Sequence, residues 1–423
     1  MLHHLVLPSL IELVGEKSVA TDESTRDRLS RDEYRQSPVL SRNLPLRQAD
    51  VVVFASSIAE VQGIARIASA TGTSITPRGK GTGNYGQGSV LSGGILLDLS
   101  RLVGIESIDE GGVTALAGTR ILTLEQTLRQ SGRELTIYPS TVQSTVGGFL
   151  AGGSGGTGSI QNGFIEDGFV SALDVVLADG SLVTVSGPDV LPLLHAYGTT
   201  GIIVRVTVAH EAARDWVAVF ASFPEFADAQ RALIRTGVLT PAPRVVSADM
   251  AEVARTFKRR APSSPASASF RAVVDRTLVD VVTGLVTDHG GTVASVEEGI
   301  QQELAVSMLS YNHPSWMFIQ AQDKEYFHVE AGGIALVEQL EGALQVWPGA
   351  LMHLDAGPDG EPLGMLTAPF TTEADIHAGV ERLQALGVHA RAPHHWTLDR
   401  RVDLVKKIAA TVDPHGLLNP GRF

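Results

Sequence analysis

Residues 77–88, PRGKGTGNYGQG, combine five glycines with an arginine and a lysine. Glycine has no Cβ and tolerates positive φ, so such a stretch lets backbone N–H groups approach a phosphate closely. Arg78 and Lys80 add positive charge beside those N–H groups. These residue types predict a loop that binds a phosphate or diphosphate. A flexible linker is a poor alternative, because such linkers rarely carry Arg and Lys between their glycines.

Residues 81–86 also match G-x-G-x-x-G, the pattern of a dinucleotide-binding Rossmann loop. A Rossmann loop joins the first strand to a helix whose N-terminus faces the pyrophosphate. Here the loop follows a predicted strand at 51–54, a helix that begins with a capping box at 57–60, and a second strand at 74–76. Residues 89–102 then predict a turn and a strand instead of a helix. This order of elements disfavours a Rossmann fold.

A second glycine-rich block, YPSTVQSTVGGFLAGGSGGTGSIQNG, covers residues 138–163. One such loop holds one phosphate-sized ligand, so two blocks predict a larger ligand, such as a dinucleotide lying across a domain. The alternative is that the glycines of the second block only permit tight packing of strands and turns. Residues 173–185 follow as two predicted strands across an Asp179-Gly180 turn.

Bulk composition narrows the class of protein. A length of 423 residues predicts two domains, or one domain with a large insertion. The net charge of −13 disfavours binding to nucleic acid. The absence of cysteine excludes disulfides, cysteine-ligated clusters and cysteinyl cofactor links. Because the chain has neither an 18-residue apolar stretch nor the pattern of a signal peptide, we expect a cytoplasmic protein without a transmembrane segment.

Five separated segments occur in one order: PRGxGTG, PST followed by VGG, AGGSGGTGS, YGTTGII and the terminal LLNPGRF. In this order they resemble the FAD-linked oxidoreductases with the vanillyl-alcohol-oxidase, or PCMH, type of FAD-binding domain, above all the glycolate and D-lactate dehydrogenase branch. The resemblance covers roughly residues 40–210 and 400–423. It implies an α+β fold, in which a two-subdomain FAD-binding domain is joined to a cap domain with an antiparallel sheet flanked by helices.

The expected organisation has four parts. These are an N-terminal helical extension over 1–40, the FAD-binding domain over 41–212, a substrate or cap domain over 213–398 and a segment over 399–423 that returns to the FAD domain. Within the cap domain, the sequence predicts a helix over 251–260 and a mobile Pro/Ser/Ala loop over 261–269.

The resemblance also implies which residues hold FAD. The first block would cradle the pyrophosphate through Pro77, Arg78, Gly79, Lys80, Gly81, Thr82, Gly83, Asn84, Gln87 and Gly88. The flavin and ribityl side would be lined by Pro139, Ser140, Thr141, Thr145, Gly147, Gly148, Gly153, Gly155, Gly156 and Ser159. The adenine would meet backbone atoms of Ile202 or Ile203, and Asn419 would reach the flavin, unless it is an ordinary turn residue before Pro420.

One departure from the family bears on how the cofactor is attached. Covalent members carry a histidine in the first loop, and Thr82 stands at that position here. There is no histidine between His4 and His195 and no cysteine in the chain. The resemblance therefore implies non-covalently bound FAD.

Flavin enzymes of this kind take a hydride from a C–H bond, and the substrate hydroxyl then needs a base, a role that suits histidine near neutral pH. The segment Asn312-His313-Pro314 reads as a turn that leads into a strand over 316–320. An Asn-His pair opens an equivalent strand in relatives, which implies that His313 faces the flavin. A histidine at a strand edge that only bonds a neighbour is the alternative.

A second candidate for the base is the pair His394 and His395, which precedes the closing helix. Chain order would bring this pair near the flavin edge, although ordinary structural roles fit it as well. His389 and His394 have no carboxylate at ligand spacing beside them, so no metal site is predicted.

The expected function is therefore that of an FAD-dependent oxidase or dehydrogenase acting on an alcohol or a 2-hydroxy acid. The alternative is an FAD-binding subunit with an electron-relay or structural role in a larger glycolate-oxidase-like complex. An NAD-dependent enzyme is disfavoured by the strand after the first loop. Oxygen, a quinone or a carrier protein all stay open as electron acceptor, and homo-oligomerisation stays open too.

Overall fold

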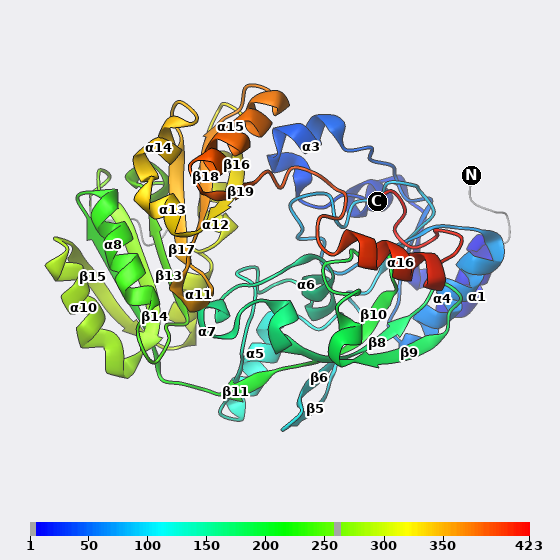
Figure 1. Cartoon of the computed structure of the whole chain (residues 1–423). Coiled ribbons are helices and arrows are strands. Elements are labelled where there is room, and N and C mark those ends of the chain that lie inside the picture. Colours follow the sequence, from blue (N-terminus) through cyan, green and yellow to red (C-terminus); the bar gives the residue numbers. More distant parts are fainter. Residues whose placement is uncertain (1–5, 258–263) are drawn as a thin grey trace.

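The computed structural model describes residues 6–257 and 264–423. Figure 1 shows two lobes. The sheets of the first lobe lie within residues 19–212, the sheet of the second lobe lies within residues 216–391, and the C-terminal helix lies against the first lobe. The predicted α+β class with an antiparallel sheet is confirmed, and the division into four domains stays a proposal. Within the described ranges, no helix is long and apolar enough to cross a membrane.

A four-stranded sheet in the first lobe positions the first glycine block. Its order is β1 (Val19–Ala20), β2 (Val51–Phe54), β4 (Ile95–Asp98) and β3 (Ile75–Arg78), with β2, β4 and β3 parallel. Helix α4 (Ile58–Thr71) begins at the predicted capping box of Ser57 and Glu60 and packs its apolar face on this sheet. Because β3 ends at Arg78, the glycine block starts where a buried strand leaves the sheet.

The second glycine block lies against a five-stranded antiparallel sheet. This sheet has the order β5 (Ile105–Asp109), β6 (Gly112–Leu116), β10 (Ile202–Val208), β8 (Val170–Val176) and β9 (Leu182–Ser186). The predicted hairpin across Asp179-Gly180 is confirmed as the β8–β9 pair. Part of the glycine block forms helix α6 (Val146–Gly152), and helix α5 (Ile121–Gln130) precedes it. Strands β7 (Arg133–Leu135) and β11 (His210–Ala212) form a separate pair.

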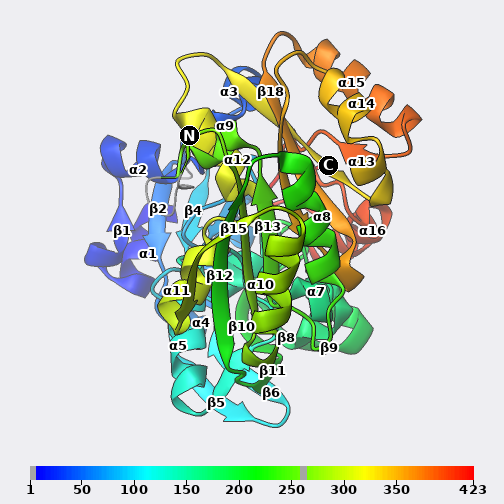
Figure 2. The same cartoon turned by 90° about the vertical axis from the view of Figure 1, so that its left-hand side faces the viewer.

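The second lobe is built on one eight-stranded antiparallel sheet. Its order is β15 (Thr292–Glu298), β12 (Trp216–Phe223), β14 (Ala268–Asp275), β13 (Val245–Asp249), β17 (Leu351–Ala356), β18 (Pro362–Pro369), β16 (Tyr326–Gly332) and β19 (His389–Arg391). Figure 2 shows α8 (Phe226–Gly237) and α10 (Val279–Asp288) in front of this sheet. The other helices of this lobe are α9 (Ala251–Ala254), α11 (Ile300–Ser307), α12 (Asn312–Gln320), α13 (Ile334–Glu338), α14 (Leu340–Gln345) and α15 (Glu373–Ala385).

One predicted element was wrong. Residues 316–320, expected to be a strand, form the second half of helix α12, and Asn312, His313 and Pro314 form its first turn. A proline is compatible with the first turn of a helix, where its missing N–H is not needed. A five-residue apolar run cannot distinguish a strand from a buried helix by its pattern alone.

Some predicted segments lie partly outside the described residues. The helix predicted over 251–260 is represented by α9, and its residues 258–260 lie outside the described residues. Residues 261–263 of the predicted loop and residues 1–5 of the N-terminal extension also lie outside them. The rest of that extension holds strand β1 and helices α1 (Val6–Val14), α2 (Glu23–Leu29) and α3 (Pro38–Asn43).

The C-terminal segment returns to the first lobe. Helix α16 (Val402–Val412) ends before Asp413, whose carboxylate accepts the backbone N–H groups of Leu417 and Leu418 at 3.0 and 2.7 Å. The tail then pairs with Ile75 at the start of β3, because Ile75 N donates to Leu417 O at 2.8 Å and Asn419 N donates to Ile75 O at 2.7 Å. The last residues are thereby fixed behind the first glycine block.

Candidate functional site

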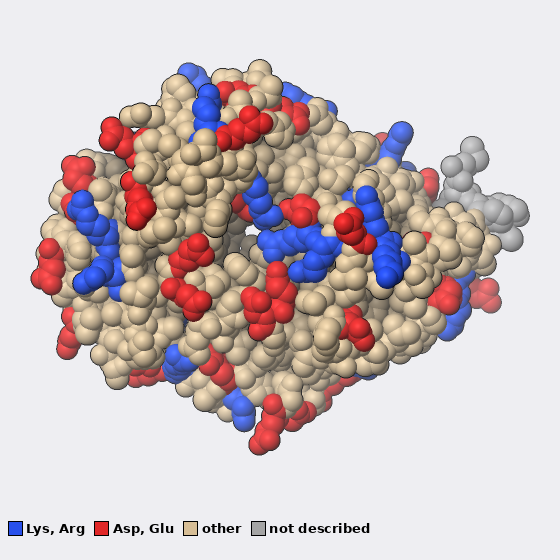
Figure 3. All heavy atoms as spheres, viewed as in Figure 1, with Lys and Arg blue, Asp and Glu red and all other residues tan. Residues whose placement is uncertain are grey.

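A cavity of about 970 Å³ lies between the two lobes. Sites for small molecules and cofactors span roughly 300–1,000 Å³, so this one has room for a large ligand. All of the predicted cofactor-binding residues except Asn419 line it. Asn419 lies behind the wall, where its side-chain amide donates to the backbone oxygen of Tyr197 at 2.7 Å. Figure 3 shows Lys and Arg side chains gathered at the hollow between the lobes.

The two glycine blocks meet at the wall of the cavity. A Cβ on Gly79 would lie 2.1 Å from Thr145 Oγ1, the atom that caps helix α6 by accepting the N–H of Gly148 at 3.2 Å. Gly81 has a φ of +65°, and a Cβ there would lie 2.0 Å from the guanidinium of Arg78. Glycine at these two positions thus permits both close packing and a backbone conformation that other residues rarely adopt.

Arg78 gives the first block a buried cationic donor. Its Nη1 donates to Arg31 O at 2.7 Å, whereas its buried Nε has no hydrogen-bond partner in the described parts of the chain. Burial lowers the pKa of Arg78, although the nearby carboxylates of Asp32 and Asp98 oppose this. A buried donor without an acceptor costs free energy, so a ligand oxygen at this point would be stabilising. A glycine cradle beside an unpartnered guanidinium nitrogen fits the diphosphate of a dinucleotide cofactor.

His313 comes to the cavity from the second lobe. Its Nδ1 lies 3.1 Å from Met308 O and its Nε2 lies 3.1 Å from Thr141 Oγ1. A proton on Nδ1 donated to Met308 leaves the lone pair of Nε2 to accept the Thr141 hydroxyl. Burial lowers the pKa of His313 below its ordinary value of 6.5, so the ring is neutral at pH 7. The helix α12 thus presents a neutral imidazole nitrogen to the second glycine block.

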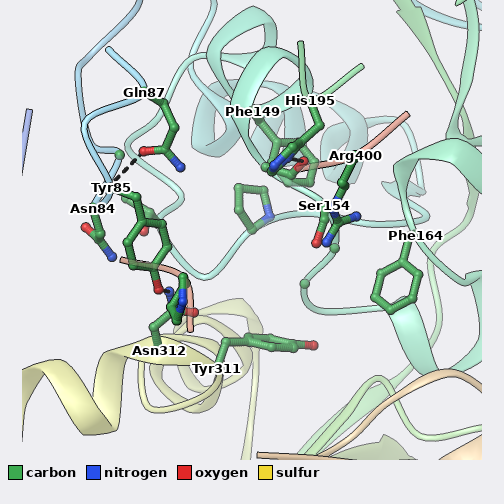
Figure 4. A pocket seen from close by; sticks show the side chains of 18 of the residues that line it. Asn84, Tyr85, Gln87, Phe149, Ser154, Phe164, His195, Tyr311, Asn312 and Arg400 are labelled. Atoms are coloured by element: carbon green, nitrogen blue, oxygen red, sulfur yellow. Dashed lines mark hydrogen bonds between the residues drawn. The ribbon is translucent and has the colours of Figure 1, made fainter. Parts of the chain in front are cut away.

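Asn312 and Tyr85 form a contact between the lobes beside His313. Figure 4 shows Tyr85 reaching from the first glycine block toward Asn312. The amide of Asn312 donates to the Tyr85 hydroxyl at 3.3 Å, and that hydroxyl donates to His328 Nε2 at 2.8 Å. Burial lowers the pKa of His328 to about 4, so its ring is neutral and can accept. Tyr85 therefore connects the first block to strand β16.

Of the two C-terminal histidines, His395 lines the cavity and His394 does not. His395 lines the cavity, with its Nδ1 donating to Thr397 O at 3.0 Å. His394 lies outside the cavity lining, where its Nε2 donates to His328 O at 2.7 Å and its ring meets that of Tyr85 edge-on. Burial lowers the pKa of His394 to about 3. The structure thus brings His313, Asn312 and His395 to one cavity and leaves His394 behind it.

Several lining residues carry chemistry that the sequence reasoning missed. They are Tyr85, His195, Tyr311, Glu330, Asp355, Arg391 and Arg400. Arg391 is paired on both sides, with Nε donating to Glu330 at 2.5 Å and Nη1 donating to Asp399 at 2.7 Å. Figure 4 shows Arg400 beside Ser154. Most of these residues come from strands and loops far apart in the chain, so no local spacing in the sequence marks them as a group.

Comparisons with known proteins agree with this site. The family model of an FAD binding domain matches residues 49–186. A probable mitochondrial D-lactate dehydrogenase of Danio rerio is 23% identical over 99% of this chain and 91% of its own length. A D-lactate dehydrogenase of Archaeoglobus fulgidus is 28% identical over 44% of each chain. Glycolate oxidase subunit GlcD of Bacillus subtilis is 30% identical over 38% of this chain and 36% of its own length. The chain thus matches less than half the length of the last two relatives.

A solved structure of alkyldihydroxyacetonephosphate synthase has the same fold. It superposes with a TM-score of 0.79, covers 100% of this chain and 85% of its own, and is 18% identical. The agreement extends over both lobes, because the whole chain is covered. The expected FAD cofactor and the expected fold are confirmed by these comparisons together.

Proposed function

We propose that this chain is an FAD-linked oxidoreductase that oxidises the CH–OH group of a 2-hydroxy acid. The observation that carries this proposal is a single cavity with a different chemistry on each side. Two glycine blocks and Arg78 line it from the first lobe, and a neutral histidine, His313, faces it from the second lobe. The first side fits a dinucleotide, and the second side fits a substrate that must lose a proton.

The residues of the first lobe would hold FAD. Backbone N–H groups of the first block and the free Nε of Arg78 would bind the diphosphate, and the second block would line the flavin side. When bound, FAD supplies an acceptor for the hydride of the substrate C–H bond. The close contact of Gly79 with Thr145 holds the two blocks side by side, so that both would contact one extended ligand.

His313 would act on the substrate hydroxyl. Its Nε2 would take the hydroxyl proton, while Met308 O holds the Nδ1 proton and so fixes the tautomer. The substrate hydroxyl would replace Thr141 Oγ1 as the group that donates to Nε2. His395 and then His394 are the alternative bases.

The choice of a 2-hydroxy acid has two supports. Relatives are named for D-lactate and glycolate, both of which carry a carboxylate beside the reacting carbon. Arg391 and Arg400 also place positive charge at the cavity wall, and the carboxylate of Glu166, at 3.4 Å, is the one acidic partner of Arg400 among the described residues. A guanidinium with spare donors can bind a carboxylate in bidentate fashion.

A second function is supported by the name of one relative, a glycolate oxidase subunit. In that case the chain would be an FAD-binding subunit that relays electrons or supports a larger complex. Oxygen, a quinone or a carrier protein all stay open as acceptor, and a cytoplasmic location stays a proposal.

Anaerobic bleaching of the flavin absorbance separates these proposals. The purified holoprotein is mixed with a panel of 2-hydroxy acids, the matching alcohols without a carboxylate, and amines. We expect bleaching by one or more 2-hydroxy acids only. Bleaching by the alcohols alone would contradict the substrate class. A flavin that dithionite reduces but no donor reduces would favour the subunit role.

A further inference from the structure

Two residues at the cavity wall have a buried side-chain polar atom without a hydrogen-bond partner, counted over the described parts of the chain. They are Arg78, through Nε, and Tyr311, through its hydroxyl. Arg78 belongs to the first glycine block, on the side where a dinucleotide fits. Tyr311 belongs to the second lobe and directly precedes Asn312 and His313. Since buried polar groups are nearly always paired, the Tyr311 hydroxyl calls for an acceptor.

The packing of Tyr311 does not explain its hydroxyl. The ring contacts an apolar cluster that consists of Trp216, Ala218, Phe220, Val245, Val273 and Val306. A phenylalanine would make the same apolar contact. Burial raises the pKa of Tyr311 well above 10, so the hydroxyl keeps its proton and can donate. Figure 4 shows Tyr311 next to Asn312 on the second-lobe side of the cavity.

We propose that the Tyr311 hydroxyl donates a hydrogen bond to an oxygen of the substrate in the cavity, and that Asp355 is the positioning residue that holds Tyr311 there. This inference rests on the proposed function. It assigns a substrate contact to the second lobe beside His313, two residues away in the chain. A donor at this point would orient the acid or its hydroxyl while His313 removes the proton.

The backbone of Tyr311 is held in an unusual conformation. Its φ of +60° and ψ of −131° are rare for a residue with a Cβ. Such conformations persist only where the surroundings fix them, and they cluster at functional sites. Here Asp355 Oδ2 accepts the N–H of Tyr311 at 2.9 Å. This bond ties the start of helix α12 to strand β17.

Asp355 is itself anchored by a buried chain. His353 Nε2 donates to Asp355 Oδ2 at 2.8 Å, and His353 Nδ1 donates to Asp249 Oδ1 at 2.8 Å. Burial lowers the pKa of His353, but the carboxylates of Asp355 and Asp249 raise it to about 9, so the ring carries a proton on both nitrogens. The hydroxyl of Ser247 also bonds to Asp355. The position of Tyr311 is thus fixed from the interior of the sheet.

The test compares Tyr311→Phe with Tyr326→Phe, both prepared as FAD-loaded protein. Tyr326 lies outside the cavity, and its ring packs edge-on against Phe318. The probe is oxalate, an unreactive dicarboxylate of similar size, titrated through the change in flavin absorbance. We expect Tyr311→Phe to keep its FAD content, to raise the Kd for oxalate about tenfold or more and to lower kcat/KM for the 2-hydroxy acid similarly. Tyr326→Phe should change neither.

Each other result has a distinct meaning. Unchanged oxalate binding and kcat/KM in Tyr311→Phe would overturn the inference. A loss of FAD without a change in oxalate binding would also overturn it, because the hydroxyl would then serve the cofactor. Wild-type protein that no 2-hydroxy acid reduces would instead contradict the proposed function, before any variant is made.

The positioning role of Asp355 is tested by a double-mutant cycle. Asp355→Asn should lower kcat/KM in the wild-type background and lower it much less in the Tyr311→Phe background, because the donor that Asp355 holds is then already absent. If Asp355→Asn lowers kcat/KM by the same factor in both backgrounds, the positioning role is overturned. FAD content and oxalate binding of each variant are measured alongside the rates.

Discussion

Thr141 Oγ1 and His313 Nε2 lie 3.1 Å apart across the cavity. Thr141 belongs to the second glycine block of the first lobe, and His313 belongs to the first turn of helix α12 in the second lobe. The contact places the candidate base at the point where the two lobes meet.

FAD should be released by acid or heat precipitation. The family resemblance implies that Thr82 stands where covalent relatives carry the linking histidine, and the chain has no cysteine. His195, which lines the cavity, has both ring nitrogens engaged, by Gly153 O at 2.9 Å and the Tyr197 hydroxyl at 3.1 Å. The absorbance of the supernatant after precipitation checks this. Yellow colour that stays with the pellet would mean a covalent link.

Gly81→Val should sharply lower FAD content. Gly81 has a positive φ, and a side chain there meets the Arg78 guanidinium, so the substitution strains the loop backbone and displaces the cationic group from the cradle. The matched control is Gly72→Val, since Gly72 has a similar φ of +63° with no atom within 4 Å of a Cβ. Both variants should lose about 1–3 kcal/mol of stability from backbone strain. Full FAD content in Gly81→Val would contradict the cradle assignment.

The pH profile of kcat/KM should have its acid limb below pH 6.5. Burial lowers the pKa of His313, so the neutral form that accepts a proton predominates at and above pH 6.5, and activity falls only as the pH drops through the lowered pKa. Rates of anaerobic flavin reduction between pH 4.5 and 8 measure this. An acid limb centred above pH 7 would assign the titration to another group.

Tyr311→Gly should be more stable than Tyr311→Ala. Glycine usually costs about 0.5–1 kcal/mol relative to alanine in regular structure. At a φ of +60° and a ψ of −131° the order should reverse, by about 1–3 kcal/mol, because only glycine adopts this conformation without strain. Urea midpoints at equal m-values give the comparison. A more stable alanine variant would show that the backbone relaxes at this position.

Local signals in the sequence were enough to predict much of the first lobe. The capping box of Ser57 and Glu60 and the Asp179-Gly180 turn each act within a few residues, and both are found where they were expected. Gly79, Gly81, Gly83 and Gly88 line the cavity. The apolar run 316–320 carried no such signal, and the strand predicted there is a helix. Its flanking proline is compatible with a turn and with a helix start alike.

The substrate side depends on contacts that are distant in the chain. Asp355 reaches Tyr311 because β17 pairs with β13 and β18 in the middle of the eight-stranded sheet. Arg391 reaches the cavity because β19 is the edge strand beside β16. Strand order in an antiparallel sheet is set by the packing of the whole lobe, so no spacing in the sequence predicts these neighbours.

Single-turnover reduction of the FAD-loaded protein by the 2-hydroxy acid identified in the donor panel tests the central claim most directly. The wild type is compared with His313→Ala, His395→Ala and His394→Ala under anaerobic conditions. We predict that His313→Ala keeps its FAD spectrum but reduces its flavin about 10²–10⁴ times more slowly, with much smaller effects at the other two positions. Unchanged reduction in His313→Ala would contradict the account, and a collapse confined to His395→Ala or His394→Ala would assign the base to the C-terminal pair.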